Sequence, residues 1–283
     1  MKPSILVYGN CQAEHIAHIG QYLPSLRDKL SFKVIPLHIV TSQQWGTRYD
    51  DAYFSDVKVL WNQVESGVPS EHRLELDRRI PADCQVVKFP PFNMLALWPF
   101  AGNDPRLANE RECRYPWTDS IAASLSGRDA SDDALFDAYM QISTEKMPDL
   151  NRRLRMDINR WRASDELADI KIADWVLENF RHTQVFYTAG HLSAPPLGAM
   201  MKELLARTRM LQPSEIYEAQ RETDFLLRDH VGQDLEVVPV HPLVAERLEL
   251  SYYDPEARHR WHGHAWSFRD YILNYIRWEP YLE

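Results

Sequence analysis

The chain has 283 residues and a formal net charge of −9, with 32 lysine and arginine residues against 41 aspartate and glutamate residues. Apolar residues make up 45% and charged residues 26% of the chain, a balance typical of globular proteins with a hydrophobic core. Because an acidic surface repels a phosphate backbone, this composition argues against general nucleic-acid binding.

Six short apolar, β-branched runs predict strands. In chain order they are Ser4–Tyr8, Phe32–Leu37, Val57–Trp61, Gln85–Phe89, Thr183–Thr188 and Leu235–Val240. Helical patterns follow the first, fifth and sixth runs, and the last two of these helices begin at proline residues, where a missing N–H group costs little. The alternation predicts an α/β fold with a mostly parallel sheet flanked by helices.

The pattern changes between residues 93 and 182, where no convincing strand is found. From Ser131 to Phe180 the sequence is charged and helical in composition. We therefore predict a single α/β domain over residues 1–283, with a largely helical insertion or cap at about 93–182. A last helix is predicted over Ala265–Trp278.

Several site classes are excluded by motif and spacing. The sequence lacks G-x-G-x-x-G, G-x-x-x-x-G-K-[ST], G-x-S-x-G and H-E-x-x-H. Three cysteines without C-x-x-C spacing argue against a disulfide framework and a zinc ribbon, and favour a reducing compartment. The N-terminal apolar run is too short for a signal peptide, and no run of 18 apolar residues exists. We therefore expect a cytoplasmic protein without a membrane span or a metal site.

Polar and titratable residues follow the predicted strands at their carboxyl ends. In chain order they are Gly9, Asn10, Cys11 and Gln12, then His38, then Pro90 and Phe92, then His191, and finally His241. Because the carboxyl ends of parallel strands meet at one edge, where ligands bind, we expect Cys11, His191 and His241 to converge. A single histidine at a strand end is as often structural, and this alternative stays open for His38.

Cys11 has the strongest physical case among these residues. It directly follows a predicted strand and begins a helix, where unpaired N–H groups and the helix dipole favour an anion and lower the pKa of a thiol. The same groups, with Asn10 and Gln12, can stabilise an oxyanion. The alternative is a buried and inert thiol, against which the polar neighbours argue. Cys84 and Cys113 lack such a setting.

These residues resemble a known family. The strand that leads into Gly9-Asn10-Cys11-Gln12 and a helix, the Pro-Pro-Phe element ending at Phe92, and the late His241-Pro242 are similar to the WcbI family of polysaccharide-biosynthesis proteins. The family's usual late Asn-His-Pro is replaced here by Gly190-His191-Leu192. The resemblance implies binding of coenzyme A or acetyl-coenzyme A, and acetyl transfer to a sugar hydroxyl of a capsular or other surface polysaccharide.

On this interpretation Cys11 accepts the acyl group or holds it beside the acceptor, and His241 or His191 is the general base. The coenzyme or oxyanion contacts would come from Gly9, Asn10, Gln12, Pro90 and Phe92. Direct transfer without an acyl-enzyme is equally compatible. Two other classes stay open: a cysteine-based esterase or hydrolase of related topology, and a non-catalytic protein that binds coenzyme A or a sugar. The acceptor sugar and the oligomeric state are not set by the sequence.

Overall fold

The computed structural model describes residues 2–65, 67–102, 118–228, 232, 236–261 and 263–277. The chain divides into two compact units, each assembled from three segments. The first unit consists of Met1–Phe92, Asn159–Val176 and His191–Gln233, and the second of Asn93–Ile158, Leu177–Gly190 and Asp234–Glu283.

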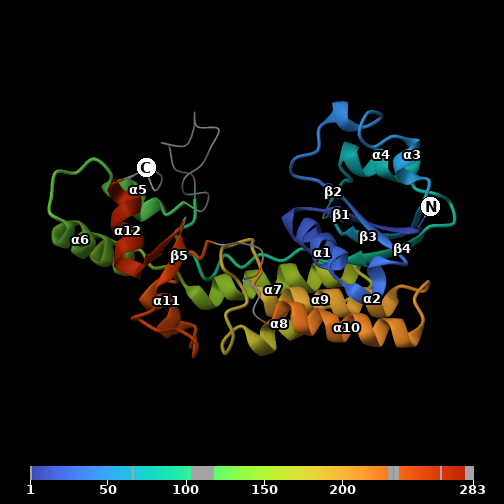
Figure 1. The fold of residues 1–283 in the computed structure, drawn as a ribbon. Helices are drawn as coiled ribbons and strands as arrows, with labels where there is room; N and C mark the ends of the chain where they lie inside the picture. The colour runs from blue at the N-terminus through green and yellow to red at the C-terminus, as the bar shows by residue number, and fades with distance from the viewer. Residues whose placement is uncertain are drawn as a thin grey trace. The chain divides into compact units, whose positions relative to one another are not determined.

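A parallel sheet of four strands forms the centre of the first unit (Figure 1). The strands are β1 (Ser4–Gly9), β2 (Ser31–Pro36), β3 (Val57–Gln63) and β4 (Gln85–Phe89), in the spatial order β2-β1-β3-β4. Tyr8 of β1 lies opposite Ile35 of β2 and Asn62 of β3 in the register. The α/β fold and four of the six predicted strands are confirmed.

Helices cover both faces of this sheet (Figure 1). They are α1 (Cys11–Gln21), α2 (Pro24–Arg27), α3 (Asp51–Phe54), α4 (Glu71–Arg79), α9 (Ala194–Arg207) and α10 (Pro213–Leu227), with a 3₁₀ turn η1 at Ser42–Gln44. On the face covered by α3 and α4, Phe54 and Leu76 pack with Tyr8 and Leu60 into one apolar core. On the α1 side, Gly20 lies against the ring of Phe32, leaving no room for a Cβ there.

The second unit is largely helical and contains a short hairpin. Its elements are α5 (Ser120–Leu125), α6 (Asp132–Glu145), α11 (Pro242–Arg247), β5 (His259–Trp261), β6 (His264–Trp266) and α12 (Phe268–Arg277). The residues of two further helices, α7 (Leu150–Leu167) and α8 (Ala173–Asn179), are divided between the two units. The helical character predicted for Ser131–Phe180 is confirmed.

Two predicted strands are wrong. Residues 183–188 and 236–240 form no regular strand, although the Val238 amide donates to the Tyr187 carbonyl at 2.9 Å; Leu235 lies outside the described residues. Both segments are rich in buried residues such as Val185 and Val240. A short apolar run indicates that a segment is buried. A buried segment need not be a strand, because a strand also has to pair with a neighbouring strand.

The last helix begins three residues later than predicted. Ala265 instead pairs with Arg260 in the antiparallel hairpin β5–β6. Ser267 then starts α12: its hydroxyl accepts from the Asp270 amide at 3.1 Å, and its own amide donates to the Asp270 carboxylate at 3.0 Å. This reciprocal pair is a capping box, a local signal that outweighs the helical spacing of the residues before it. Residue 278 lies outside the described part of the chain.

Candidate functional site

The turn from β1 into α1 is tightly packed. A Cβ on Gly9 would lie 2.6 Å from the Gln63 Cβ and 2.9 Å from the Ala13 Cβ, so this position requires glycine. Asn10 caps the helix, because its Oδ1 accepts from the Gln12 amide at 2.9 Å. The Asn10 amide donates to Gln63 Oε1 at 2.8 Å. These contacts fix Cys11 as the first residue of α1.

Cys11 is partly exposed at the start of an 11-residue helix. The cap binds the Gln12 amide, and the Asn10 carbonyl accepts from the Glu14 amide at 3.2 Å. Neither contact uses the amides of Cys11 and Ala13, which belong to the first turn and lack partners within the helix. Ala13 is fully buried, whereas Cys11 is partly exposed. A carbonyl group delivered to the Cys11 thiol would therefore meet the Cys11 amide and the positive end of the helix dipole.

Cys84 has a different setting from Cys11. It immediately precedes β4, and burial raises the pKa of its thiol to about 11. A thiol of this kind is almost entirely protonated at neutral pH and therefore a poor nucleophile. Cys113 lies outside the described residues.

Gln12 is fully buried and binds the segment that follows β4. Its Nε2 donates to the Phe92 carbonyl, while its Oε1 accepts from the Phe92 amide at 3.0 Å and from Gln63 Nε2 at 3.2 Å. The side chain thus pairs with both main-chain groups of Phe92, as a neighbouring strand would. These contacts give Gln12, predicted as an oxyanion or coenzyme contact, a structural task at the first turn of α1.

Pro90 and Phe92, also predicted to contact the coenzyme, are both buried. The Phe92 ring is 2% exposed, and its centroid lies 6.1 Å from that of Trp161 in α7. The contacts described for Phe92 are therefore with the protein, through its main chain to Gln12 and through its ring to Trp161. A direct contact of either residue with a coenzyme stays a prediction.

His191 belongs to the same unit as Cys11 and lies just ahead of α9. Its side chain is partly exposed, and α9 contacts α1. Ser193, the N-cap of α9, has a buried hydroxyl without a hydrogen bond in the described structure. The reason is local: the residues whose amides usually donate to an N-cap hydroxyl, the second and third of the helix, are Pro195 and Pro196, which have no N–H group.

His241 belongs to the second unit and is buried. As the N-cap of α11, its Nδ1 accepts from the Leu243 amide at 3.1 Å. Its Nε2 lies 2.9 Å from the Ser143 hydroxyl, which itself donates to the Met140 carbonyl at 3.0 Å. Ser143 must therefore accept from His241, so the proton sits on Nε2 and the ring is neutral. Burial lowers the pKa of His241 to about 4.

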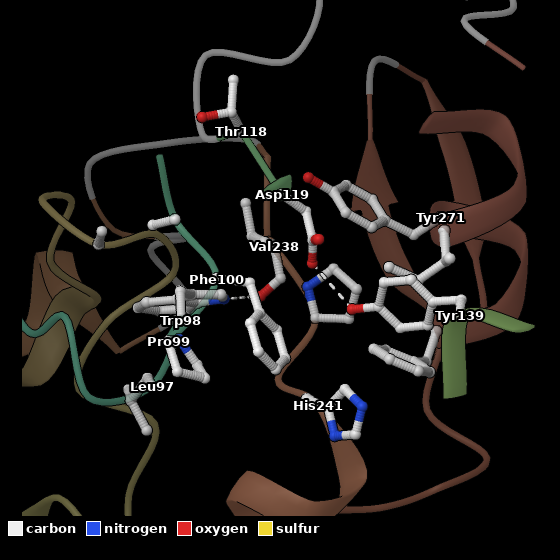
Figure 2. Close-up of a pocket in the computed structure, with 15 residues that line it drawn as sticks. Leu97, Trp98, Pro99, Phe100, Thr118, Asp119, Tyr139, Val238, His241 and Tyr271 are labelled. Atoms are coloured by element: carbon white, nitrogen blue, oxygen red, sulfur yellow. Dashed lines mark hydrogen bonds between the residues drawn. The ribbon is translucent and has the colours of Figure 1, made fainter. Parts of the chain in front are cut away.

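Aromatic side chains surround His241 (Figure 2). The Phe268 ring lies 5.4 Å from the imidazole and the Phe100 ring 6.1 Å, centroid to centroid. Nearby, Tyr139 donates to Asp119 at 2.8 Å, and burial raises the pKa of that carboxyl group. The cavity between these residues measures only about 30 Å³. This space suits one or two water molecules and is too small for a coenzyme or a sugar.

The predicted convergence of Cys11, His191 and His241 stays a prediction. Its premise, that each follows a strand of one sheet, holds for Cys11 but not for the two histidines, because the strands predicted before them do not form. In His241, both ring nitrogens are occupied, so action as a base requires that one of these bonds be released. His38 follows β2 as predicted, and its exposed Nε2 lies 3.9 Å from the Glu14 carboxylate.

Sequence reasoning missed Asn62 and Gln63. Both are buried at the carboxyl end of β3, and Gln63 binds Asn10 and Gln12. The strand was predicted to end at Trp61, two residues early, because its apolar run stops there. One sequence feature could have identified them: Asn62 and Gln63 directly follow an apolar run, much as Asn10 and Gln12 follow the first strand.

Two histidines near the C-terminus, His259 and His264, lie in the hairpin β5–β6. Burial lowers the pKa of His259, and the His264 ring stacks on Trp266 at 5.3 Å between centroids. His262 lies outside the described residues. Over the described parts of the chain, no group of three or more His, Cys, Asp or Glu side chains is arranged to hold a metal ion. None of the described helices is long and apolar enough to cross a lipid bilayer.

Comparison with known proteins decides the family. A family profile described as polysaccharide biosynthesis enzyme WcbI matches residues 4–213. The chain belongs to the WcbI family. The match extends from β1 to the first residue of α10, so it includes Cys11 and His191 and ends before His241.

The WcbI fold is also found in a solved structure. That structure is described as WcbI, a polysaccharide biosynthesis enzyme, in its native form without a disulfide bond between coenzyme A and one of its cysteines. The two proteins share 17% sequence identity with a TM-score of 0.71, and the alignment covers 99% of this chain and 91% of that one. At this identity the likeness shows a common fold. No curated protein sequence gives a significant match.

Proposed function

We propose that this WcbI-family protein binds coenzyme A and transfers an acyl group from acyl-coenzyme A to a sugar hydroxyl during polysaccharide biosynthesis. The observation that carries the proposal is the position of Cys11, a partly exposed thiol at the capped start of α1 within the family match. The description of the solved WcbI structure, which relates coenzyme A to a cysteine, supports the choice of coenzyme.

The residues around Cys11 fit the reactive end of such a coenzyme. When bound, acyl-coenzyme A supplies the acyl group as an activated thioester. The amide of Cys11 would donate to the carbonyl oxygen as negative charge develops on it, and Asn10 holds this turn in place through its cap. The Cys11 thiol would accept the acyl group, with its proton passing to the coenzyme sulfur as the thioester C–S bond breaks, or would lie beside the acyl group while the sugar attacks directly.

We assign the general base to His191. It would take the proton from the sugar hydroxyl as that oxygen attacks the carbonyl carbon, and later give it to the departing thiolate. His191 lies in the unit of Cys11 and within the family match, whereas the two ring nitrogens of His241 already make hydrogen bonds. His241 acting as the base remains the alternative assignment.

Two other functions give different products. A hydrolase would release free acid from acetyl-coenzyme A or an acetylated sugar when no acceptor is present. A non-catalytic binding protein would bind coenzyme A but release no thiol with any acceptor. Release of the free thiol that depends on an added sugar distinguishes acyl transfer from both.

Thermal unfolding with coenzyme A tests the cofactor. A ligand at a hundred times its dissociation constant stabilises the folded state by about 2.7 kcal/mol, so the melting temperature should rise by about 5–10 °C. Bound coenzyme should also protect Cys11 from limiting iodoacetamide, with the slow labelling of Cys84 as the internal control. No thermal shift at millimolar coenzyme A would remove the cofactor from the proposal.

A further inference from the structure

A larger cavity lies in the first unit, at the carboxyl ends of β3 and β4 beside α4. Its volume is about 240 Å³, far more than the roughly 15 Å³ that one water molecule requires. All of its lining residues belong to the first unit. They are Asn62, Val64, Glu65, Pro69, Arg73, Asp77, Lys88 and Leu167.

Asn62 is the unusual member of this lining. It is 3% exposed, and its Oδ1 is buried without a hydrogen bond in the described structure. Buried amide oxygens are almost always paired, because an unpaired acceptor has lost its water and gained nothing in return. Asn62 lies opposite Tyr8 and Lys88 in the strand register, so the sheet holds it in position at the cavity. A donor from a bound molecule would supply the missing hydrogen bond.

The charges around the cavity balance. Arg73 binds Asp77 in α4, with 2.7 Å between Nη2 and Oδ1 and 3.1 Å between Nε and Oδ2. Glu65 accepts from the Tyr8 hydroxyl at 3.1 Å and from the Ser70 amide at 3.0 Å. Two cations and two carboxylates thus leave no net charge, which disfavours a phosphate-rich ligand such as the nucleotide part of a coenzyme.

Lys88 adds an available donor. Its main chain is fixed, because its amide donates to the Asp169 carboxylate at 2.7 Å and its carbonyl accepts from the Asp169 amide at 2.9 Å. Its side chain is exposed and forms no ion pair with any described carboxylate. The cavity therefore offers an amide, an ammonium group and a partly exposed carboxylate, that of Asp77, as separate hydrogen-bonding groups.

Apolar side chains complete the lining. Val64 and Pro69 come from the segment between β3 and α4, and Leu167, 54% exposed, comes from the end of α7. Polar groups that both donate and accept, next to a small apolar surface and without net charge, match a neutral sugar ring, whose hydroxyl groups do both and whose C–H face is apolar. We propose that this cavity binds a neutral pyranose ring of the acceptor. This inference rests on the proposed function and gives the acceptor a site of its own.

Ligand-detected saturation-transfer NMR of the full chain tests the site, with a panel of neutral methyl pyranosides at tens of millimolar as probes. At least one pyranoside should bind to the unmodified protein. Asn62→Leu, of similar volume, should raise its dissociation constant by about fivefold, the effect of one neutral hydrogen bond, and Lys88→Met by about tenfold, because its ammonium donor is charged. Lys58→Met is the matched control, because Lys58 is an exposed lysine of β3 that pairs with Asp83 and does not line the cavity. It should leave binding unchanged.

Three results would overturn the inference. The first is no saturation transfer from the protein to any pyranoside, and the second is pyranoside binding that neither cavity substitution weakens. The third is loss of pyranoside binding when coenzyme A is added at saturation. The last would mean that the coenzyme occupies the cavity. Lys88 is exposed, so its variant keeps the test valid if Asn62→Leu unfolds. The proposed function fails separately, by the absence of a thermal shift with coenzyme A, a measurement that needs no sugar.

Discussion

Cys11, the first residue of α1, and His241, the N-cap of α11, look alike in sequence, since each is a polar residue between an apolar run and a helix. In the folded protein they differ. Cys11 follows a strand of the parallel sheet, is partly exposed, and leaves first-turn amides unused by the cap. His241 follows an irregular segment, and each of its ring nitrogens has a protein partner.

The difference shows how to read such patterns. A polar side chain at a helix start can serve the fold, by capping, or can be left available for a ligand. The number of hydrogen bonds it already makes separates the two, and a sequence does not show that number. On this criterion Asn10 and His241 serve the fold, whereas Cys11 is available.

Replacement of Cys11 should have the largest effect on activity. Cys11→Ala is expected to lower acyl transfer by about a thousandfold or more if the thiol forms an acyl-enzyme, because the nucleophile is lost. The melting temperature should change little, since a small side chain at a partly exposed turn leaves little cavity. Cys84→Ala is the control and should keep full turnover. Full activity of Cys11→Ala would instead indicate direct transfer with a histidine base.

Replacement of Gln12 should have the largest effect on stability. Gln12→Leu leaves the buried amide and carbonyl of Phe92 without their partner, and we expect a loss of about 3 kcal/mol in the free energy of unfolding. Gln21 offers a control on the same helix, because it is exposed and makes one bond of 3.3 Å to Phe32. Gln21→Leu should change stability by less than about 0.5 kcal/mol. Denaturant titration measures both, and equal losses would contradict the structural task given to Gln12.

Replacement of His241 should mainly lower stability, whereas replacement of His191 should mainly lower activity. His241→Ala removes the cap of α11 and the partner of Ser143, so it should lower the free energy of unfolding by about 2 kcal/mol. His191→Ala should be milder for the fold but should lower acyl transfer by about 10²–10⁴-fold, as expected for loss of a general base. If His241→Ala abolished transfer at unchanged stability, the base would have to be reassigned to His241.

The buried imidazole should also make stability depend on pH. Because burial lowers the pKa of His241 to about 4, from 6.5, the unfolded chain binds this proton more readily. The stabilisation is therefore complete above pH 6.5 and is lost as the pH falls through 6.5 towards 4, by about 1–2 kcal/mol between pH 7 and pH 5. The positive charge of Arg247 adds to the shift. The raised pKa of buried Asp119, in the same pocket, has the opposite sign, because it favours the folded state at low pH.

The variant His241→Asn isolates the contribution of His241 to the pH dependence of stability. Asparagine keeps the helix cap but does not titrate, so the variant should lose less stability than the wild-type protein between pH 7 and pH 5. The measurement is denaturant unfolding of both proteins across this range, with Asp119 unchanged in each. Parallel curves would mean that His241 titrates normally in the folded protein.

Local sequence was sufficient for the sheet and for the position of Cys11. Gln85–Phe89 was predicted with its observed bounds, and α1 begins at Cys11 as expected, because an apolar run and an Asn cap act within a few residues. What sequence could not supply was the partner of each polar group. Gln12 meets Phe92 across 80 positions and His241 meets Ser143 across 98, and nothing local encodes such pairs.

The two wrongly predicted strands have the same cause. The segments around Phe186 and Val238 are apolar because they are buried, and only long-range pairing decides whether a buried segment becomes a strand. Asn62 was missed because the apolar run ended before the strand did. For the two wrong strands, the apolar run correctly indicated burial, but a strand also requires pairing with distant residues.

The order in which the chain is made matters for Trp61. Its indole is fully buried and donates to the Thr208 hydroxyl at 3.1 Å, at the end of α9. Helix α9 begins 105 residues after β4 ends, from position 89 to position 194. At about 5–20 residues per second, the ribosome needs about 5–20 seconds to synthesise the chain between the end of β4 and the start of α9, the helix that covers Trp61. During this interval the nascent sheet exposes an aromatic face, so a fragment that stops before α9 should aggregate, and binding by chaperones during translation should concentrate there.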